Sequence, residues 1–193
     1  SGTGCSGEEI PFLGHTPEGR DPSQESSYPQ DTDQETDVSP DAVQGRALSV
    51  RELEQWTDFV NRKENNGFLL CHYEKVREMD PNEVLYNGAG METAPLPEEI
   101  AAYEARGYTV ETDIFLLRAE DIDSFLESKT GLRLEDMEKE LDWIYLKSRN
   151  SYITQHGDTN FCYFVCTEGR QKGDEYELEC RAENMGGKNC RVT

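Results

Sequence analysis

Hydrophobic residues recur at helical spacing just after residue 49. Ser49 and Glu52 match a capping box, in which the serine hydroxyl accepts from the backbone N–H of Glu52 and the glutamate reaches back. The apolar positions that follow are three or four residues apart, which places them on one face of a helix: Val50, Leu53, Trp56 and Val60. Asn65, Asn66 and Gly67 have the composition of a turn, so we expect them to end this helix.

The next hundred residues alternate between strand-like and helix-like patterns. Residues 68–73 form an apolar run that predicts a buried strand, and residues 84–86 predict a short strand between two turns. Pro97 suits the first turn of a helix that Gly107 ends. The pattern then predicts a strand over 109–117, a helix over 120–129 that Gly131 ends, and a short helix around 134–141.

Four further strands are predicted near the C-terminus, over residues 143–146, 152–154, 161–167 and 175–180. The last two flank a glycine-containing hairpin loop at 169–174. The order of elements predicts an α+β fold, with short helices first and a C-terminal antiparallel β-meander last. A chain of this length has room for one such domain and a tail.

Residues 1–46 differ in composition from the rest. They carry ten acidic and two basic side chains and are rich in Pro, Ser, Gln and Thr. Such a segment buries too little apolar area to offset its ordering entropy, so we expect a disordered acidic tether. Ile10, Phe12 and Leu13 are a short apolar patch able to dock on the domain. We place the single folded domain at residues 47–193.

The charge of the chain argues against some classes of binding partner. Lys and Arg number 19 against 40 Asp and Glu, which gives a net charge of −21. Nucleic-acid and anionic-membrane binding both depend on clustered basic residues, so neither is expected. No stretch is apolar enough for a transmembrane helix, and no nucleotide-binding, zinc-protease or serine-hydrolase motif occurs. We therefore expect no metal ion and no other cofactor.

Cysteines point to an oxidising compartment. Four of the six lie within the last 32 residues: Cys162, Cys166, Cys180 and Cys190. A hairpin folded about residues 172–173 places Cys166 opposite Cys180, and a slightly shifted loop brings Cys162 there instead. This density fits a C-terminal region stapled by disulfides. The alternative is a set of reduced, buried thiols in a cytosolic protein.

Cys5 is a candidate lipid anchor. It lies among small residues, as in the processing site of a bacterial lipoprotein, although Gly2 stands where a large aliphatic residue is usual. An anchor upstream of the given sequence is a second possibility. Both interpretations predict an extracytoplasmic protein, attached to the membrane or secreted.

Polar residues between two late strands are the candidates for chemistry. His156, Asp158 and Asn160 lie in one predicted turn, where oxygen atoms could bind Ca²⁺ or side chains could simply support the backbone. Cys71 and His72 are neighbours in a predicted strand and should point to opposite faces, which disfavours a catalytic dyad. Cys162 with His156 is a second conceivable pair.

Aromatic residues follow the late strands. Strand alternation places Trp143 and Tyr145 on one face, which is either part of the core or a platform for a sugar or peptide.

An ordered set of short motifs resembles a known family. The motifs are Glu52-Leu53 with Trp56, Phe59-Val60-Asn61, residues 64–70, residues 86–90, Phe125-Leu126 with Lys129-Thr130-Gly131, Leu141-Asp142-Trp143 with Tyr145-Leu146, and residues 156–160. Together they resemble an extracytoplasmic domain family of unknown function from Gram-positive anaerobic bacteria, whose members are commonly lipoproteins or secreted modules. The resemblance implies export from the cytoplasm. It supplies no catalytic residues, because no activity is established for the family.

Two functions of different class follow. The first is a surface-displayed or secreted, non-enzymatic binding or structural module, expected to be monomeric, with a protein or glycan ligand at the cell surface. The second is a hydrolase of cell-envelope or carbohydrate substrates that uses carboxylates around residues 156–160. A cytosolic acidic adaptor is a third interpretation if the thiols are reduced.

Overall fold

The computed structural model describes residues 45–183 and 189–192. The predicted acidic tether, the apolar patch at Ile10 and the anchor candidate Cys5 lie outside the described residues. The first described element is strand β1 (Arg46–Ala47). Regular structure therefore begins one residue before the predicted start of the domain.

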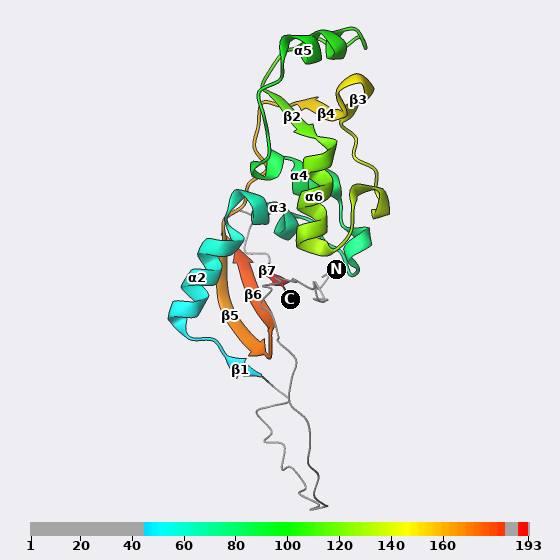
Figure 1. Ribbon diagram of the computed structural model, residues 1–193. Helices are drawn as coiled ribbons and strands as arrows, with labels where there is room; N and C mark the ends of the chain where they lie inside the picture. Colours follow the sequence, from blue (N-terminus) through cyan, green and yellow to red (C-terminus); the bar gives the residue numbers. More distant parts are fainter. Residues whose placement is uncertain (1–44, 184–188, 193) are drawn as a thin grey trace, which may run out of the picture.

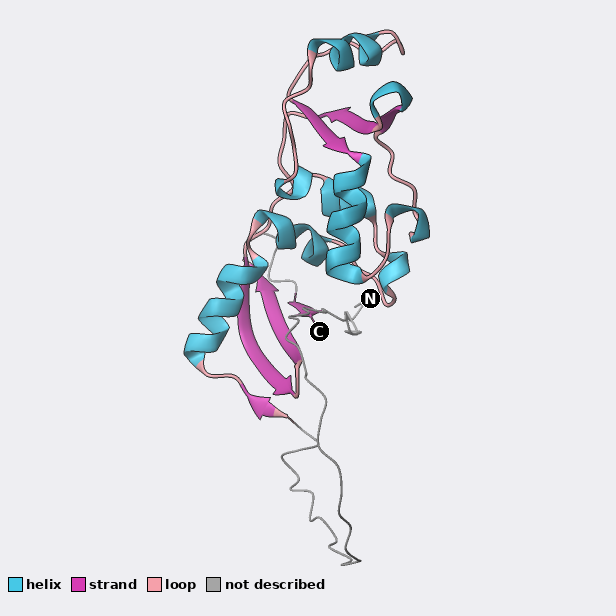
Figure 2. Ribbon diagram, viewed as in Figure 1, coloured by secondary structure: helices cyan, strands magenta, loops and turns pink. Residues whose placement is uncertain are grey.

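The fold is α+β, as predicted, with two antiparallel sheets (Figures 1 and 2). The helices are α2 (Val50–Val60), α3 (Lys63–Leu70), α4 (Pro81–Leu85), α5 (Pro97–Glu104) and α6 (Ala119–Thr130). Short 3-10 turns are η1 (Val76–Glu78), η2 (Gly88–Gly90), η3 (Leu134–Asp136) and η4 (Lys147–Arg149). The other strands are β2 (Ile114–Arg118), β3 (Ile144–Leu146), β4 (Ser151–Gln155), β5 (Phe164–Lys172), β6 (Glu175–Ala182) and β7 (Asn189–Val192).

The predicted late strands do not form one meander. Strands β2, β4 and β3 make one sheet, whereas β1, β5, β6 and β7 make a second, in those orders. The two sheets lie towards opposite ends of the molecule, with α3, α4 and α6 between them (Figure 1). Residues 156–163 lead from β4 in the first sheet to β5 in the second. The predicted C-terminal antiparallel meander is therefore confirmed for β5, β6 and β7, whereas the predicted strands at 143–146 and 152–154 belong to the other sheet.

The first predicted helix is confirmed. In α2 the Ser49 hydroxyl accepts from the Glu52 N–H, and the Glu52 carboxylate accepts from the Ser49 N–H at 2.8 Å. The predicted end of helix α6 is also confirmed, because Gly131 follows it in the left-handed conformation with φ of 73°. Glycine adopts this conformation without the steric cost that a Cβ atom brings.

The predicted stop at residues 65–67 and strand at 68–73 are wrong. Asn65, Asn66 and Gly67 are buried inside helix α3, which runs to Leu70. A Cβ atom on Gly67 would lie 2.4 Å from the carbonyl oxygen of Val84, so glycine is needed for α3 to approach the backbone of α4. The turn-like composition therefore serves helix packing rather than chain reversal.

The predicted strand at residues 84–86 is helix α4 instead. Asp80 caps this helix by accepting from the Asn82 N–H at 3.0 Å, and Pro81 occupies its first turn. Val84 and Leu85 are buried in the larger core. Three consecutive apolar residues fit a buried helix as well as a buried strand, so the pattern alone did not distinguish the two.

Strands β5 and β6 form the predicted hairpin with a tighter turn. Gly169 lies within β5, opposite Leu178, rather than in the loop. A Cβ atom on Gly169 would come within 2.7 Å of the Leu48 side chain and 2.9 Å of Leu178, so this glycine lets the N-terminal segment pack on the sheet. The predicted six-residue loop thus shrinks to the turn at Gly173 and Asp174.

The first sheet separates two cores. Along β2, Ile114 and Leu116 pack in the smaller core with Tyr103 of α5, whereas Phe115 and Leu117 pack in the larger core. The larger core also receives the apolar faces of α6, α3 and α4 and the buried residues of β5 and β6. This alternation is the period-two pattern of a strand buried on both faces.

An ion pair joins helix α5 to this sheet. Arg118 at the end of β2 pairs with Glu99, whose side chain is fully buried. Burial works to raise the pKa of Glu99, but hydrogen bonds from the Leu96 N–H and Arg118 outweigh it, and the pKa lies below its ordinary value. Glu99 is therefore ionised at neutral pH, and the pair fixes the position of α5.

Candidate functional site

His156 is enclosed between two aromatic rings at the start of the connection between the sheets. Its ring stacks on Tyr86 at 4.2 Å and on Phe115 at 4.1 Å between centroids. Its Nδ1 lies 2.8 Å from the Asp158 carbonyl oxygen, and its Nε2 lies 2.8 Å from that of Tyr86. Both ring nitrogens are thus engaged with the backbone, so neither is open to a substrate or a metal ion.

The other two predicted residues of this turn are also held by hydrogen bonds within the protein. Asp158 is 78% exposed at its side chain and accepts from the Tyr86 hydroxyl at 2.7 Å. This hydrogen bond raises the pKa of Tyr86. The Asn160 N–H donates to Asn87 Oδ1 at 3.1 Å, and Asn87 Nδ2 donates back to the Asn160 carbonyl at 2.9 Å. These contacts favour the structural interpretation of the turn over the Ca²⁺ interpretation.

Backbone groups beyond the turn also form hydrogen bonds with asparagine side chains. The carbonyl of Cys162 accepts from Asn66 Nδ2 at 2.7 Å. Phe164 is bound twice by Asn61, through its N–H at 2.9 Å and its carbonyl at 2.7 Å. These bonds continue the pattern begun at residue 160, with a bound residue at every second position.

The series ends inside the second sheet, where the N–H of Cys166 donates to the Thr57 hydroxyl at 3.0 Å. Residues 160, 162, 164 and 166 are therefore held by four polar side chains from helices and turns, which we call the clamp residues: Thr57, Asn61, Asn66 and Asn87. They occupy one edge of an extended segment, in place of a neighbouring strand.

The role of the clamp residues was not predicted from the sequence. Thr57 and Asn61 are four positions apart and directly follow Trp56 and Val60 of the apolar stripe, so they lie at the border of the buried face of α2. That position was a usable signal, because a polar side chain beside the core must find a hydrogen-bond partner. The identity of the partner, more than 100 residues away, carries no local signal.

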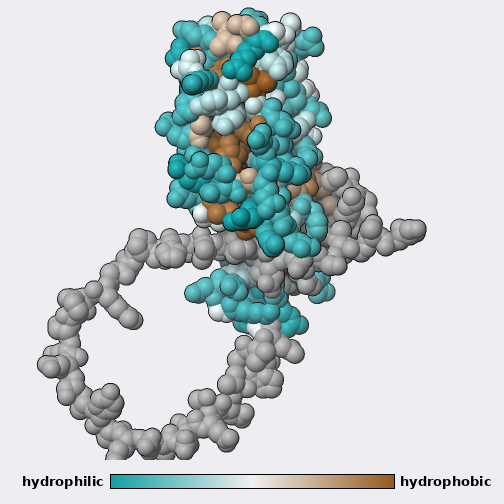
Figure 3. All heavy atoms as spheres, turned by 90° about the vertical axis from the view of Figure 1, so that its right-hand side faces the viewer, coloured by the Kyte–Doolittle hydropathy of each residue, from teal (hydrophilic) through white to brown (hydrophobic). Residues whose placement is uncertain are grey.

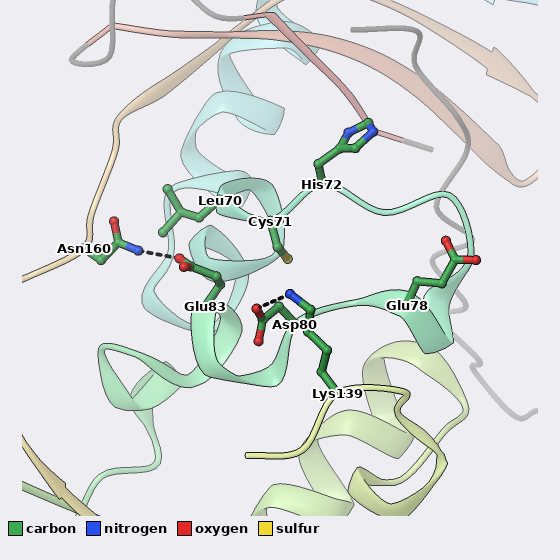
Figure 4. Close-up of a pocket in the computed structure, with 8 residues that line it drawn as sticks. All are labelled: Leu70, Cys71, His72, Glu78, Asp80, Glu83, Lys139 and Asn160. Atoms are coloured by element: carbon green, nitrogen blue, oxygen red, sulfur yellow. Dashed lines mark hydrogen bonds and ion pairs between the residues drawn. The ribbon is translucent and has the colours of Figure 1, made fainter. Parts of the chain in front are cut away.

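A pocket of about 430 Å³ opens beside the clamped segment (Figure 4). Its lining is mostly polar: Leu70, Cys71, His72, Glu78, Asp80, Glu83, Lys139 and Asn160. Lys139 donates to Asp80 at 2.7 Å, and Asn160 Nδ2 donates to Glu83 at 2.6 Å. Asn160 thus links the predicted turn to this pocket, whereas His156 and Asp158 do not line it.

Electrostatics shift the pKa values of three residues in the pocket, Asp80, Lys139 and Cys71. Burial acts to raise the pKa of Asp80, but hydrogen bonds from Lys139 and Asn82 outweigh it and hold the pKa below its ordinary value. The same bond with Asp80 raises the pKa of Lys139. Burial, together with the negative charges of Asp80 and Glu83, raises the pKa of the Cys71 thiol to about 12. A thiol with this pKa is not a nucleophile at neutral pH.

Neither the disfavoured pair of Cys71 with His72 nor the conceivable pair of Cys162 with His156 forms. Cys71 follows the end of α3 rather than lying in a strand, and Figure 4 shows its sulfur and the His72 ring pointing in different directions. The Cys162 thiol faces the carbonyl of Tyr163 at 3.8 Å, while both nitrogens of His156 contact other carbonyls. Among the described residues, no group of three or more His, Cys, Asp or Glu side chains could hold a metal ion.

The predicted aromatic face divides between core and surface. Trp143 is 8% exposed and belongs to the larger core. Tyr145 is 38% exposed, packs on Tyr152 at 4.9 Å between ring centroids, and donates to Asn150 at 2.8 Å. Since Trp143 is buried and Tyr145 is exposed, the two do not form one exposed platform. The face of the molecule shown in Figure 3 is mostly hydrophilic, with separate apolar patches.

The predicted alignment of Cys166 with Cys180 is confirmed. The two residues are directly opposite in the β5–β6 register, which excludes the shifted alternative with Cys162. Their Sγ atoms are 3.0 Å apart, and the four cysteines whose side chains the structure describes, Cys71, Cys162, Cys166 and Cys180, have no two sulfurs at the length of a disulfide bond. The backbone of Cys190 is opposite Cys180 on the other side, in the β6–β7 register.

Comparison of the chain with protein-family models, with curated proteins and with solved structures finds no match. Within the part of the chain that the structure describes, the helices are all too short or too polar to span a bilayer.

Proposed function

We propose that this chain is a non-enzymatic binding module that is displayed on the cell surface or secreted, and that it binds its ligand at the pocket beside Asn160. The ligand is part of a protein or a glycan that offers hydroxyl or ammonium groups. The observation that carries the proposal is the lining of the pocket, where three carboxylates and one ammonium group surround a volume of about 430 Å³.

The charge of the pocket supports this class of ligand. Three carboxylates, from Glu78, Asp80 and Glu83, line the pocket together with one ammonium group, that of Lys139, which pairs with Asp80. The excess of acceptors favours groups that donate hydrogen bonds, such as sugar hydroxyls and amines. The volume of about 430 Å³ is large enough for one sugar ring or one amino-acid side chain.

A hydrolase of cell-envelope or carbohydrate substrates is the competing proposal. The carboxylates of Asp80 and Glu83 in one pocket favour it, because glycoside cleavage uses two carboxyl groups. General acid catalysis, however, needs a carboxyl group that keeps its proton near neutral pH, whereas the pKa of Asp80 is lowered. We therefore prefer binding over hydrolysis.

Titration of the isotope-labelled full-length chain with soluble peptidoglycan fragments tests the proposal, because these fragments carry sugar hydroxyls and free amines. We expect saturable NMR shift changes at residues that line the pocket and no change in the fragments themselves. Asp80→Asn and Glu83→Gln keep the shape of the side chains and remove their charge, so each should weaken binding about tenfold. Glu54→Gln on the exposed face of α2 is the matched control and should bind normally.

Two results would overturn the proposal. Cleavage of the fragments, detected by mass spectrometry and lost in Glu83→Gln, would assign the hydrolase instead. Shift changes that are confined to residues outside the pocket, and are unaffected by either variant, would place the ligand elsewhere.

Export is proposed on the acidic N-terminal composition, the cysteine content and the family resemblance. Cell fractionation with antibodies against the chain, with and without treatment of intact cells by protease, tests it. Protection of the whole chain from protease in intact cells would contradict export.

A further inference from the structure

Cys166 and Cys180 lie side by side in the larger core, on neighbouring strands. Both are buried, at 4% and 1% exposure, and their Sγ atoms are 3.0 Å apart. Directly opposite residues of an antiparallel pair have Cα atoms about 4.5–5.5 Å apart, inside the range that a disulfide spans. We propose that the mature protein carries a disulfide between Cys166 and Cys180, and that this bond makes the stability of the second sheet depend on redox conditions.

The backbone at Cys166 favours this pairing. Its N–H donates to the Thr57 hydroxyl of α2, on the side of β5 that faces away from β6. The N–H and carbonyl of one residue in an antiparallel strand point to the same side, so Cys166 and Cys180 form a non-hydrogen-bonded pair. Side chains approach most closely at such positions, which brings the two sulfurs together without any movement of the backbone.

A β-bulge beside the pair fixes its position along the strands. The register shifts between Cys166 and Glu168, so the extra residue Thr167 follows the cysteine directly. The Thr167 hydroxyl donates to the Glu179 carbonyl at 3.2 Å, which ties the bulge to β6. Thr57 and Thr167 thus hold Cys166 from both edges of its strand, and its partner in the register is Cys180.

The chemistry of the thiols supports bond formation. The Cys166 thiolate attacks one sulfur of a small disulfide such as oxidised glutathione, and one glutathione thiolate leaves. The Cys180 thiolate then attacks the Cys166 sulfur and releases the second glutathione thiolate. Two protein thiols are oxidised, one glutathione disulfide is reduced, and the two protons pass to the leaving thiolates.

Because both sulfurs are buried in the folded protein, the disulfide must form before folding is complete. An oxidant in solution cannot reach two sulfurs that are 1–4% exposed, so the exchange takes place during folding, before the larger core closes. In the folded protein the same burial protects the bond from external reductants. The inference does not depend on the proposed binding function.

Refolding of the full-length chain tests the pairing. The denatured, reduced protein is refolded with a mixture of reduced and oxidised glutathione, remaining thiols are blocked with N-ethylmaleimide, and the protein is digested without reductant. Trypsin together with chymotrypsin separates Cys162 from Cys166, because chymotrypsin cleaves after Tyr163 and Phe164. We expect mass spectrometry to find one peptide pair joined through Cys166 and Cys180.

A stability measurement provides the second readout. A disulfide that closes a loop of this length raises the ratio of folded to unfolded molecules on the order of 100-fold in the chain-entropy model. We expect this difference between oxidised and reduced wild type in urea, and none in the double variant Cys166→Ala, Cys180→Ala. Cys162→Ala removes an equally buried thiol outside the pair and should retain the full difference.

The inference is overturned if refolded protein carries blocking groups at both Cys166 and Cys180. It is also overturned if Cys180 is joined to Cys190 or to Cys162 instead. The digest of the wild type alone decides between these results, so the test stands even if the double variant fails to fold.

Discussion

The extended segment from residue 160 to residue 166 has two edges that are satisfied in different ways. On the edge that faces β6, backbone meets backbone: the Glu183 N–H donates to the Tyr163 carbonyl at 2.9 Å, and Val165 is opposite Arg181. On the other edge the clamp residues supply side-chain amides and a hydroxyl. The first edge tolerates any side chain that can form a strand. The second depends on the chemistry of four particular residues.

Many polar side chains near this segment already hold backbone groups, so they are not free to act on a substrate. Asn61, Asn66 and Asn87 hold the backbone, while the ring nitrogens of His156 contact carbonyls. A buried backbone group without a partner costs about 1–3 kcal/mol, so each of these contacts has structural value. The pocket beside Asn160, by contrast, is lined mostly by polar side chains, and it is the place where we propose that a ligand binds (Figure 4).

Among substitutions at the edge that side chains hold, Asn61→Ala should lower the free energy of unfolding most. The substitution removes the partners of both the N–H and the carbonyl of Phe164, which is buried. We expect the free energy of unfolding to fall by about 3 kcal/mol, measured by urea denaturation. Gln171→Ala is the matched control, since it removes an amide from the exposed end of the same strand, and it should cost less than about 0.5 kcal/mol. Equal losses for the two variants would contradict the distinction between the edges.

Thr57→Val should have a smaller effect at the same edge. Valine keeps the shape of the buried side chain but cannot accept from the Cys166 N–H. We expect a loss of about 1–2 kcal/mol in the same urea experiment. Thr57→Ser retains the hydroxyl and should recover most of the hydrogen-bond contribution. A Thr57→Val variant as stable as wild type would show that the Cys166 N–H needs no side-chain partner.

Glu52→Gln should change stability least, and its difference from wild type should vanish in acid, where wild-type Glu52 is protonated as well. Hydrogen bonds from Arg46 and Ser49 lower the pKa of Glu52 from 4.5 to about 2. The unfolded chain therefore binds more protons than the folded chain between these values, so the stabilisation is complete above pH 4.5 and is lost as the pH falls towards 2. We expect the urea midpoint of wild type to fall more steeply than that of Glu52→Gln across this interval. Parallel curves for the two proteins would contradict the assigned pKa.

The same contrast explains what the sequence could and could not predict. Helix α2, helix α6 and the β5–β6 hairpin depend on local periodicity, caps and a glycine turn, and all three were predicted. Residues 63–85 were assigned wrongly, because Asn66 and Gly67 resemble a turn locally. Their real partners are the Cys162 carbonyl and the backbone of Val84, both distant along the chain.

The candidate site was predicted only in part for the same reason. The turn that contains His156, Asp158 and Asn160 was recognised, and Asn160 does reach the pocket. Asp80, Glu83 and Lys139 were not singled out, because a chain with 40 acidic residues gives no reason to prefer any one of them. Tertiary contacts bring them together: Asn160 binds Glu83, and Asn82 binds the backbone of Glu140 and Asp142, which places Lys139 beside Asp80.

Amide hydrogen exchange at Phe164 tests the central claim most directly. The account predicts that this amide is protected in wild type and that Asn61→Ala accelerates its exchange far more than that of Glu183, whose N–H is bound to backbone on the opposite edge. Rapid exchange at Phe164 in the wild type, or an equal acceleration at both amides in the variant, would contradict the claim that side chains hold this edge.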